Sequence, residues 1–393
     1  MKDRLTELLD FEGFREAFSS GELYTESDEP AIVFINVADF KSFNRVYGYN
    51  TGDEALKFVA SLLSLNFPGE LIARIGDDHF ITTAGSCETL LQSKIDKINS
   101  SLADHPDRGL IVKAGLSHIH GSSDIFRACD RARIACEKIG SSHDISLNRY
   151  EPSMSREIVL NRYIIDHIDE AIEKEWLTVH YQPVMRIMTN EMSHAEALCR
   201  WKDPEHGFIS PVDFIPVLED SRLIWKVDEF VIKKVCSDIR MMLDQHSLPV
   251  PISVNLSRQD FDQSLCNIFS YTESCIKETG ISRDYLAIEV TESALIENID
   301  DLSTGVKQFH EGGYKLWMDD FGSGYSSLNV LRDYPFDVLK LDRDFILALD
   351  EHDSDRTALV LYSILKMAKE SGMQTVCEGV ETQEALEFIK NLG

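Results

Sequence analysis

The chain has 393 residues, about two to three times a common domain length, so more than one domain is expected. Its 67 acidic and 39 basic residues give a formal net charge of −28, which argues against binding to nucleic acid polymers or to anionic membrane surfaces. No apolar run reaches the roughly 18–20 residues of a membrane span, the N-terminus lacks a signal-peptide core, and the eight cysteines show no zinc spacing, so we expect a cytoplasmic protein.

The first 150 residues predict a small α/β domain. Strand-like and helix-like segments alternate there, which favours a central sheet with covering helices. The expected strands are 31–37, 71–84 (a hairpin) and 109–118, and the expected helices are 52–65, 88–104 and 123–139. The stretch 141–157 is polar and has no sustained period, so we place the domain boundary there.

For the second domain, 157–393, the sequence pattern predicts a β/α barrel. A helical run over 156–174 leads into a series of strand-then-helix units, the pattern of that fold. The expected strands are 177–185, 193–201, 251–257, 286–293, 315–322, 338–342 and 374–380.

Polar residues gather at the strand ends of this barrel. At or just beyond the C-terminal end of a predicted strand lie Glu196, Asn255, Glu289, Asp319, Asp320, Lys340 and Glu378. The C-terminal ends of barrel strands converge on one face, where active sites form. Carboxylates with an amide oxygen and no histidine favour Mg²⁺ or Mn²⁺, and Asp319 with Asp320 could bridge two ions that act on a phosphodiester. Alternatively, each acid caps a helix or lies on a solvated loop.

The second domain resembles the EAL family of cyclic di-GMP phosphodiesterases. The resemblance rests on YQPV (181–184), EALCRW (196–201), FIPVLED (214–220), VNLS (254–257), EVTES (289–293), DDFGSGYSSL (319–328), LKLD (339–342) and EGVET (378–382). It implies a modified TIM-type barrel that hydrolyses cyclic di-GMP to linear pGpG with two Mg²⁺ or Mn²⁺ ions, and a homodimer formed through this domain. The alternative is a receptor that binds cyclic di-GMP without hydrolysis and signals through a protein partner.

The resemblance also implies a role for each matching residue. One ion would be held by Glu196, Asn255, Glu289 and Asp319, and the second by Asp319, Asp320 and Glu378. Lys340 would position or activate the attacking water. Glu292 and Glu381 would brace the metal loop and its surroundings, and Gln182 and Arg200 would contact the substrate.

Two departures from the family pattern stand out. Ser323 replaces the more usual threonine of the DDFG loop but keeps a hydroxyl. The chain ends at Gly393, before the Gln-Gly-Tyr/Phe segment of the family. We therefore expect the barrel to lack its last strand and helix, which leaves an unpaired edge.

The first domain resembles a GGDEF (diguanylate cyclase) domain that has lost its catalytic residues. The matching segments are 5–14, 34–56 and RIGDDHF (74–80). Against catalysis, the signature is Gly76-Asp77-Asp78-His79, Asn36 replaces a metal-binding aspartate, Glu137 replaces a lysine near the phosphates, and the RxxD inhibition site expected near Phe67–Glu70 is absent. The guanine-reading pair is kept as Asn44 and Asp53, so the domain is expected to act as a scaffold or to bind GTP weakly.

Overall fold

The computed structural model describes residues 1–20, 30–104, 109–119, 125–140, 142, 144–297, 299–322, 328–347 and 354–392. The chain divides into a first unit, Met1–Leu160, and a second unit, Asn161–Gly393. Each is described by itself below. The long helix α6 (Pro152–Glu173) runs across the division. No helix in the described ranges combines the length and the apolar character that a membrane span requires.

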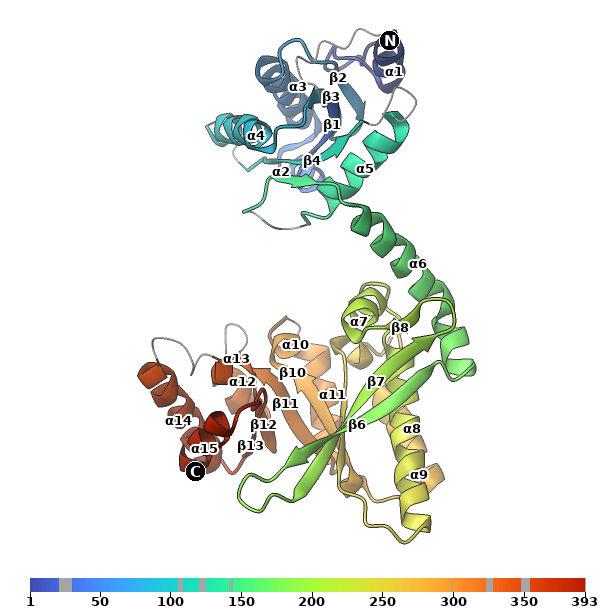
Figure 1. The fold of residues 1–393 in the computed structure, drawn as a ribbon, viewed down its shortest axis with the longest axis vertical. Helices are drawn as coiled ribbons and strands as arrows, with labels where there is room; N and C mark the ends of the chain where they lie inside the picture. Colours follow the sequence, from blue (N-terminus) through green and yellow to red (C-terminus); the bar gives the residue numbers. More distant parts are fainter. Residues whose placement is uncertain are drawn as a thin grey trace. The chain divides into compact units, whose positions relative to one another are not determined.

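The first unit is a five-stranded sheet with helices on both faces (Figure 1). Its strands are β1 (Pro30–Val37), β2 (Ile72–Gly76), β3 (His79–Gly85), β4 (Val112–His118) and β5 (Leu147–Arg149), in the order β2-β3-β1-β4-β5. Its helices are α1 (Phe11–Ser19), α2 (Phe40–Tyr47), α3 (Tyr49–Asn66), α4 (Glu88–Ala103) and α5 (Ile125–Glu137). This arrangement confirms the α/β class predicted for the first domain.

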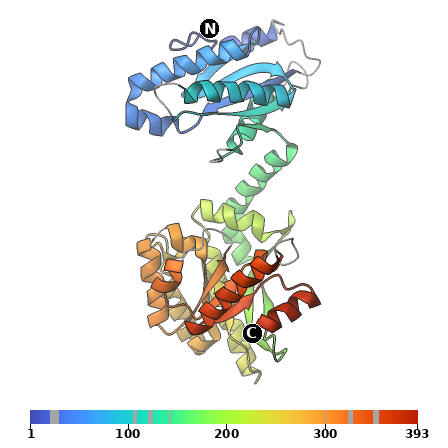
Figure 2. The same ribbon diagram turned by 90° about the vertical axis from the view of Figure 1, so that its left-hand side faces the viewer.

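Alternation along β1 explains the two layers of helices. Successive side chains of a strand point to opposite faces, and both faces of β1 are apolar. Ala31, Val33 and Ile35 pack with α3 and α4, whereas Ile32 and Phe34 pack with α1 and α5. Figure 2 shows α3 and α4 lying across one face of this sheet.

The polar stretch 141–157 is more ordered than its composition indicated. It contains β5, which pairs in parallel with β4, and the first turns of α6. The strand has only three residues, too few for a periodic pattern to emerge from the sequence.

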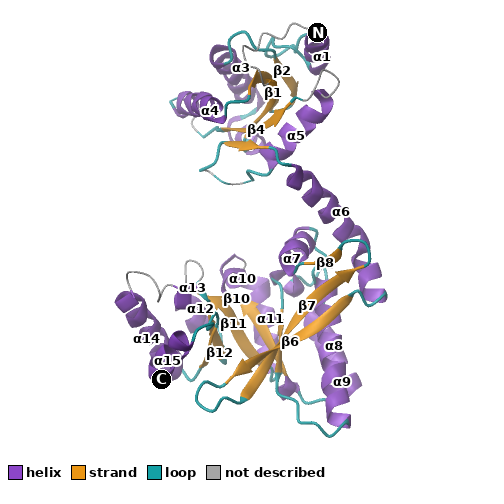
Figure 3. Ribbon diagram, viewed as in Figure 1, coloured by secondary structure: helices purple, strands orange, loops and turns teal. Residues whose placement is uncertain are grey.

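The second unit is a curled sheet with helices outside it (Figure 3). Its strands are β6 (Leu177–Met185), β7 (Met192–Asp203), β8 (Gly207–Ile209), β9 (Ile252–Asn255), β10 (Leu286–Thr291), β11 (Lys315–Phe321), β12 (Val338–Leu341) and β13 (Gln374–Cys377). The helices that follow α6 are α7 (Pro211–Asp220), α8 (Trp225–Asp244), α9 (Ile268–Thr279), α10 (Glu292–Glu297), α11 (Ile299–Glu311), α12 (Leu328–Asp333), α13 (Asp344–Leu347), α14 (Ser354–Glu370) and α15 (Gln383–Leu392), with short 3-10 helices η2 (Arg258–Phe261) and η3 (Arg283–Tyr285).

The strand order is β13-β12-β11-β10-β9-β7-β6, with β8 beside β7. From β7 to β13 the neighbours in this path are parallel, and β10 and β12 are almost wholly buried, as expected for strands covered on both faces. This confirms the modified β/α barrel class. One feature was not predicted: β6 runs antiparallel to β7, because the link 186–191 is too short for a crossover helix.

Candidate functional site

A buried ammonium group surrounded by carboxylates lies at the centre of the site. Lys340 on β12 is 2% exposed. Its Nζ lies 3.1 Å from Glu196 Oε2, 3.1 Å from Glu289 Oε2, 2.9 Å from Asp319 Oδ1 and 2.9 Å from Glu378 Oε1. Five of the residues selected from the sequence therefore meet at one point.

Neighbouring parallel strands bring these residues together. Asn255 is the last residue of β9 and lies in register with Glu289 on β10, and Glu378 follows directly after β13. The Nδ2 of Asn255 donates to Glu196 Oε1 at 2.8 Å. Glu196 was expected near the C-terminal end of its strand, but it lies in the first half of β7. The strand continues seven residues past Glu196, to Asp203, and its last three residues pair with β8.

A bulge lets two adjacent aspartates serve the same site. In a regular strand, Asp319 and Asp320 would point to opposite faces of the sheet. The β11–β12 register shifts between Met318 and Phe321, and Asp320 has a left-handed φ of 56°, which is uncommon outside glycine. The Oδ1 of Asp319 also accepts from the Asp320 backbone N at 3.0 Å. The local distortion thus turns both carboxylates toward one place.

The acids of the site outnumber the single ammonium group of Lys340, and this excess of negative charge shifts their pKa values. Burial raises the pKa of Glu289, and the neighbouring Glu196 and Asp319 raise it further against the attraction of Lys340. Burial alone would lower the pKa of Lys340, but the surrounding carboxylates raise it. Burial, with the charges of Asp319, Asp342 and Glu378, raises the pKa of Asp320 to about 6. All three directions follow from excess negative charge in a poorly solvated place.

The donor set fits two divalent cations. The acids form two groups that share Asp319, one with Glu196 and Glu289 and one with Asp320 and Glu378, and in each group the ligand atoms lie within 4.8 Å of one another. The buried Oε1 of Glu289 accepts no hydrogen bond from any described residue. Five carboxylates and one ammonium carry four net negative charges when ionised, which two divalent cations would balance. All the ligand atoms are oxygens, the preference of Mg²⁺ and Mn²⁺.

The two residues expected to brace the metal loop, Glu292 and Glu381, differ in their surroundings. Glu292 is buried, and its Oε2 accepts from the Gly322 backbone N at 3.0 Å, two residues after Asp320. Gly322 has a φ of 96°, and a Cβ there would lie 2.0 Å from the ring of Phe345. Glu381, by contrast, is exposed. Ser323 and the loop to residue 327 lie outside the described residues.

A pocket of about 460 Å³ adjoins the acid cluster and contains Arg200. Arg200 lies two strand positions beyond Leu198 and four beyond Glu196, so the three side chains share a face of β7. The lining residues that the sequence analysis did not select include Leu198, Ser257, Arg258, Gln259 and Thr291. The EALCRW, VNLS and EVTES motifs, which contain Leu198, Ser257 and Thr291, were the available signal. Gln182 does not line this pocket, but it lies directly opposite Glu196 across the β6–β7 pair.

In the signature hairpin of the first unit, Asp78 is the only acid at a position where the family resemblance implies a metal ligand. Asn36 on β1 pairs in register with His79 on β3, and its buried Oδ1 accepts no hydrogen bond from the described residues. The Asp78 carboxylate lies 3.6 Å from His79 Nε2. Asp77 at the turn has a positive φ of 33°. No group of three metal-binding side chains was found here among the described residues.

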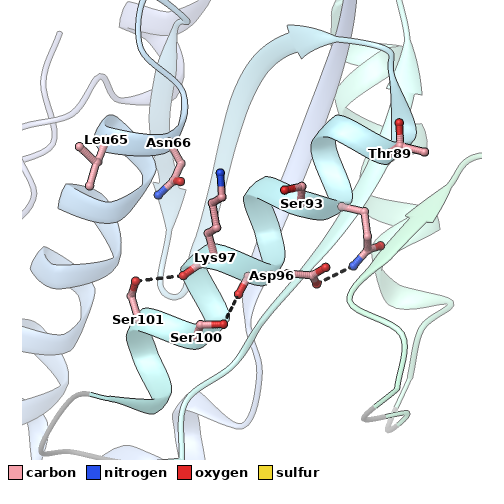
Figure 4. A pocket seen from close by; sticks show the side chains of 9 residues that line it. Leu65, Asn66, Thr89, Ser93, Asp96, Lys97, Ser100 and Ser101 are labelled. Carbon is pink, nitrogen blue, oxygen red and sulfur yellow. Dashed lines mark hydrogen bonds between the residues drawn. The ribbon is translucent and has the colours of Figure 1, made fainter.

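The two residues expected to read guanine, Asn44 and Asp53, lie on α2 and α3. Asn44 on α2 contacts Gly52 closely, since a Cβ on Gly52 would lie 1.9 Å from Asn44 Oδ1, and Asp53 is exposed on α3. A hollow of about 780 Å³ in this unit lies elsewhere, between the end of α3 and α4, and is lined mainly by small polar side chains (Figure 4). Neither Asn44 nor Asp53 lines it, and it contains no cluster of acids or bases.

Comparison with known proteins agrees with both resemblances. The EAL domain family matches residues 165–393, and the family described as "Diguanylate cyclase, GGDEF domain" matches residues 1–143. The cyclic di-GMP phosphodiesterase PdeR of Escherichia coli is 29% identical over 403 residues, covering 100% of this chain and 60% of PdeR. The bifunctional diguanylate cyclase/cyclic di-GMP phosphodiesterase MucR of Pseudomonas aeruginosa is 30% identical over 375 residues, covering 92% of this chain and 54% of MucR. The chain thus spans little more than half the length of these relatives.

Two solved structures are also similar to this chain. The structure described as the PaMucR phosphodiesterase in complex with c-di-GMP has 34% identity and a TM-score of 0.54, covering 59% of this chain and 92% of that one. The S helix-GGDEF-EAL structure of Vibrio cholerae LapD has 19% identity and a TM-score of 0.56 over 100% of this chain and 93% of its own, which supports the fold alone. The chain therefore belongs to the EAL domain family, and its EAL domain is preceded by a GGDEF domain.

Proposed function

We propose that the EAL domain of this chain hydrolyses cyclic di-GMP to linear pGpG in a reaction that requires Mg²⁺ or Mn²⁺. The observation that supports this most strongly is the pair of acid groups sharing Asp319 around Lys340. A protein that only binds the nucleotide would not need a second group of converging carboxylates. The relatives named as phosphodiesterases and the c-di-GMP complex of PaMucR point to the same substrate.

The chain's own residues would act on the phosphodiester as follows. Two bound cations would supply a polarised phosphate and a readily deprotonated water. Glu196, Asn255 and Glu289 would hold the first cation, Asp320 and Glu378 the second, and Asp319 both. Lys340 offers N–H donors and no acceptor while protonated, so it would orient the attacking water. Arg200 and Gln182, near Glu196 on β7 and β6, would orient the substrate.

The metal requirement is the first test. Hydrolysis should be absent in excess chelator and return when Mg²⁺ or Mn²⁺ is added, because the carboxylates cannot activate water without cations. Ca²⁺ should support turnover poorly, since its longer bonds and looser geometry suit a two-ion site badly. The measurement is pGpG formation followed by chromatography. Full activity in excess chelator would contradict the proposal.

For the GGDEF domain, we propose a scaffold or regulatory role without cyclase activity. Incubation of Glu196→Ala, which silences the phosphodiesterase, with GTP and Mg²⁺ should give no cyclic di-GMP. Asn36 and His79 remove acidic ligands, and Asp77 adds negative charge where the triphosphate would approach. Cyclic di-GMP formed by that variant would show that the domain is an active cyclase.

The remaining expectations stay proposals: the domain limits 1–150 and 157–393, weak GTP binding through Asn44 and Asp53, a homodimer through the EAL domain, and a cytoplasmic location. The bracing role of Glu381 also stays a prediction.

A further inference from the structure

Two buried carboxyl groups lie close together at the pocket beside the metal site, and one of them lines it. Asp228 on α8 is 9% exposed and Asp260 on η2 is 1% exposed. Their side chains lie close enough for each to shift the pKa of the other. Two ionised carboxylates offer acceptors only, so a hydrogen bond between them requires a proton on one of them.

One buried oxygen of each carboxyl has no hydrogen-bond donor among the described residues. The Oδ2 of Asp228 and the Oδ1 of Asp260 are buried and accept no hydrogen bond from an N–H or O–H group of the described residues. The other oxygen of Asp260, Oδ2, accepts from the Ser257 backbone N at 2.8 Å. One oxygen of each carboxyl is thus left for the other, and buried acceptors of this kind are costly unless a proton lies between them.

The surroundings favour retention of that proton. The charged groups with the largest effects on the pair are Glu219 of α7 and Glu229 of α8, both acidic, while Arg200 of β7 lines the same pocket as Asp228. The thiols of Cys199 on β7 and Cys266 after η2 also lie near it, and burial raises the pKa of both. From α11, the contact with η2 is made by the uncharged Gly305 and Phe309, and Arg258 of η2 is itself exposed.

Burial raises the pKa of both carboxyls of the pair, that of Asp260 to about 7 and that of Asp228 well above its usual range. The two partners divide the proton between them, and the pair titrates as a unit. Both directions agree with the missing donors described above.

The pair holds a segment that adjoins the metal site. Ser257 donates from its backbone N to Asp260 Oδ2 and from its Oγ to Glu219 Oε1, each at 2.8 Å. Two residues earlier, Asn255 binds Glu196, and between them the Leu256 backbone N donates to the Glu289 carbonyl oxygen at 2.9 Å. Asp228, Ser257, Asn255 and Arg200 line the same pocket.

We propose that Asp228 and Asp260 are positioning residues that share one proton, and that this proton fixes the Asn255–Phe261 segment in the arrangement that binds the substrate. When the proton is lost, two facing negative charges repel each other and the segment moves away from that arrangement. The substrate in this proposal rests on the proposed function, whereas the shared proton does not.

The first experiment needs no substrate. Asp228→Asn places a permanent N–H donor opposite Asp260, and Asp244→Asn is the matched control, the same change at an exposed acid at the end of the same helix. With Mg²⁺ present, infrared spectra should show a protonated carboxyl in the wild type and in Asp244→Asn that titrates near about pH 7, and the Asp228→Asn spectrum should lack it. Asp260→Asn, which replaces the other carboxyl of the pair, should likewise remove the band of the protonated carboxyl. An identical carboxyl band in wild type and Asp228→Asn would overturn the shared proton.

The second experiment separates positioning from folding. Between about pH 6 and about pH 8.5, the KM of the wild type for cyclic di-GMP should rise on the order of tenfold more than that of Asp228→Asn, while the two proteins show the same pH dependence of kcat. Equal KM changes in both proteins would overturn the positioning role. Should the chain not hydrolyse cyclic di-GMP at all, the infrared result still decides whether the pair shares a proton.

Discussion

Glu196→Ala should lower the kcat/KM for cyclic di-GMP on the order of a thousandfold or more, with the fold preserved. The Glu196 side chain receives hydrogen bonds from Asn255 Nδ2 at 2.8 Å and from Lys340 Nζ at 3.1 Å, and it belongs to the first acid group. Its loss removes a cation ligand and the partner that fixes a second ligand, Asn255. The measurement is the initial rate of pGpG formation together with a calorimetric titration of Mn²⁺, whose binding should weaken.

Glu205→Ala is the matched control, since Glu205 is an exposed acid in the turn between β7 and β8. It should keep the wild-type rate. If Glu196→Ala also kept a rate near that of the wild type, the assignment of the catalytic site would be wrong.

Lys340→Met should lower the free energy of unfolding by about 3–5 kcal/mol when no divalent cation is present, because it leaves several buried carboxylates without their counter-charge. Saturating Mg²⁺ should restore much of this loss, since cations bound to the folded state stabilise it and supply the missing positive charge. Turnover should fall even with Mg²⁺ bound, because the attacking water loses its donor. Urea unfolding in chelator and in Mg²⁺ measures the first two effects, and the pGpG assay measures the third.

Lys315→Met provides the comparison. Lys315 is an exposed residue of β11 whose ion pair with Asp337 lies at the surface, so its loss should cost less than about 1 kcal/mol with or without Mg²⁺. A loss in Lys340→Met that Mg²⁺ leaves unchanged would mean that Lys340 is important for packing and does not act as a counter-ion of the cluster.

Much of the site could be predicted because the C-terminal ends of successive parallel strands lie side by side in the sheet. Once strands were expected around Asn255, Glu289 and Lys340, the convergence of their ends followed from the fold. Glu289 and Lys340 were the clearest signals, since charged residues within otherwise apolar strands need partners.

Other features depend on contacts that local patterns do not encode. The bulge that turns Asp320 inward depends on the register between β11 and β12, and the three-residue β8 is defined only by its pairing with β7. The Asp228–Asp260 pair joins residues 32 positions apart on two helices, and in the sequence each resembles an ordinary solvated acid. Tertiary packing decided these features.

The most direct test of the central claim is hydrolysis in water enriched in oxygen-18. Purified protein incubated with cyclic di-GMP and Mn²⁺ in this water should yield pGpG whose new terminal phosphate carries one heavy oxygen, because water attacks the phosphodiester once in each opening of the ring. The heavy product should be absent from the Glu196→Ala sample. Recovery of intact cyclic di-GMP from wild-type protein that has bound it would contradict the account and identify the chain as a receptor.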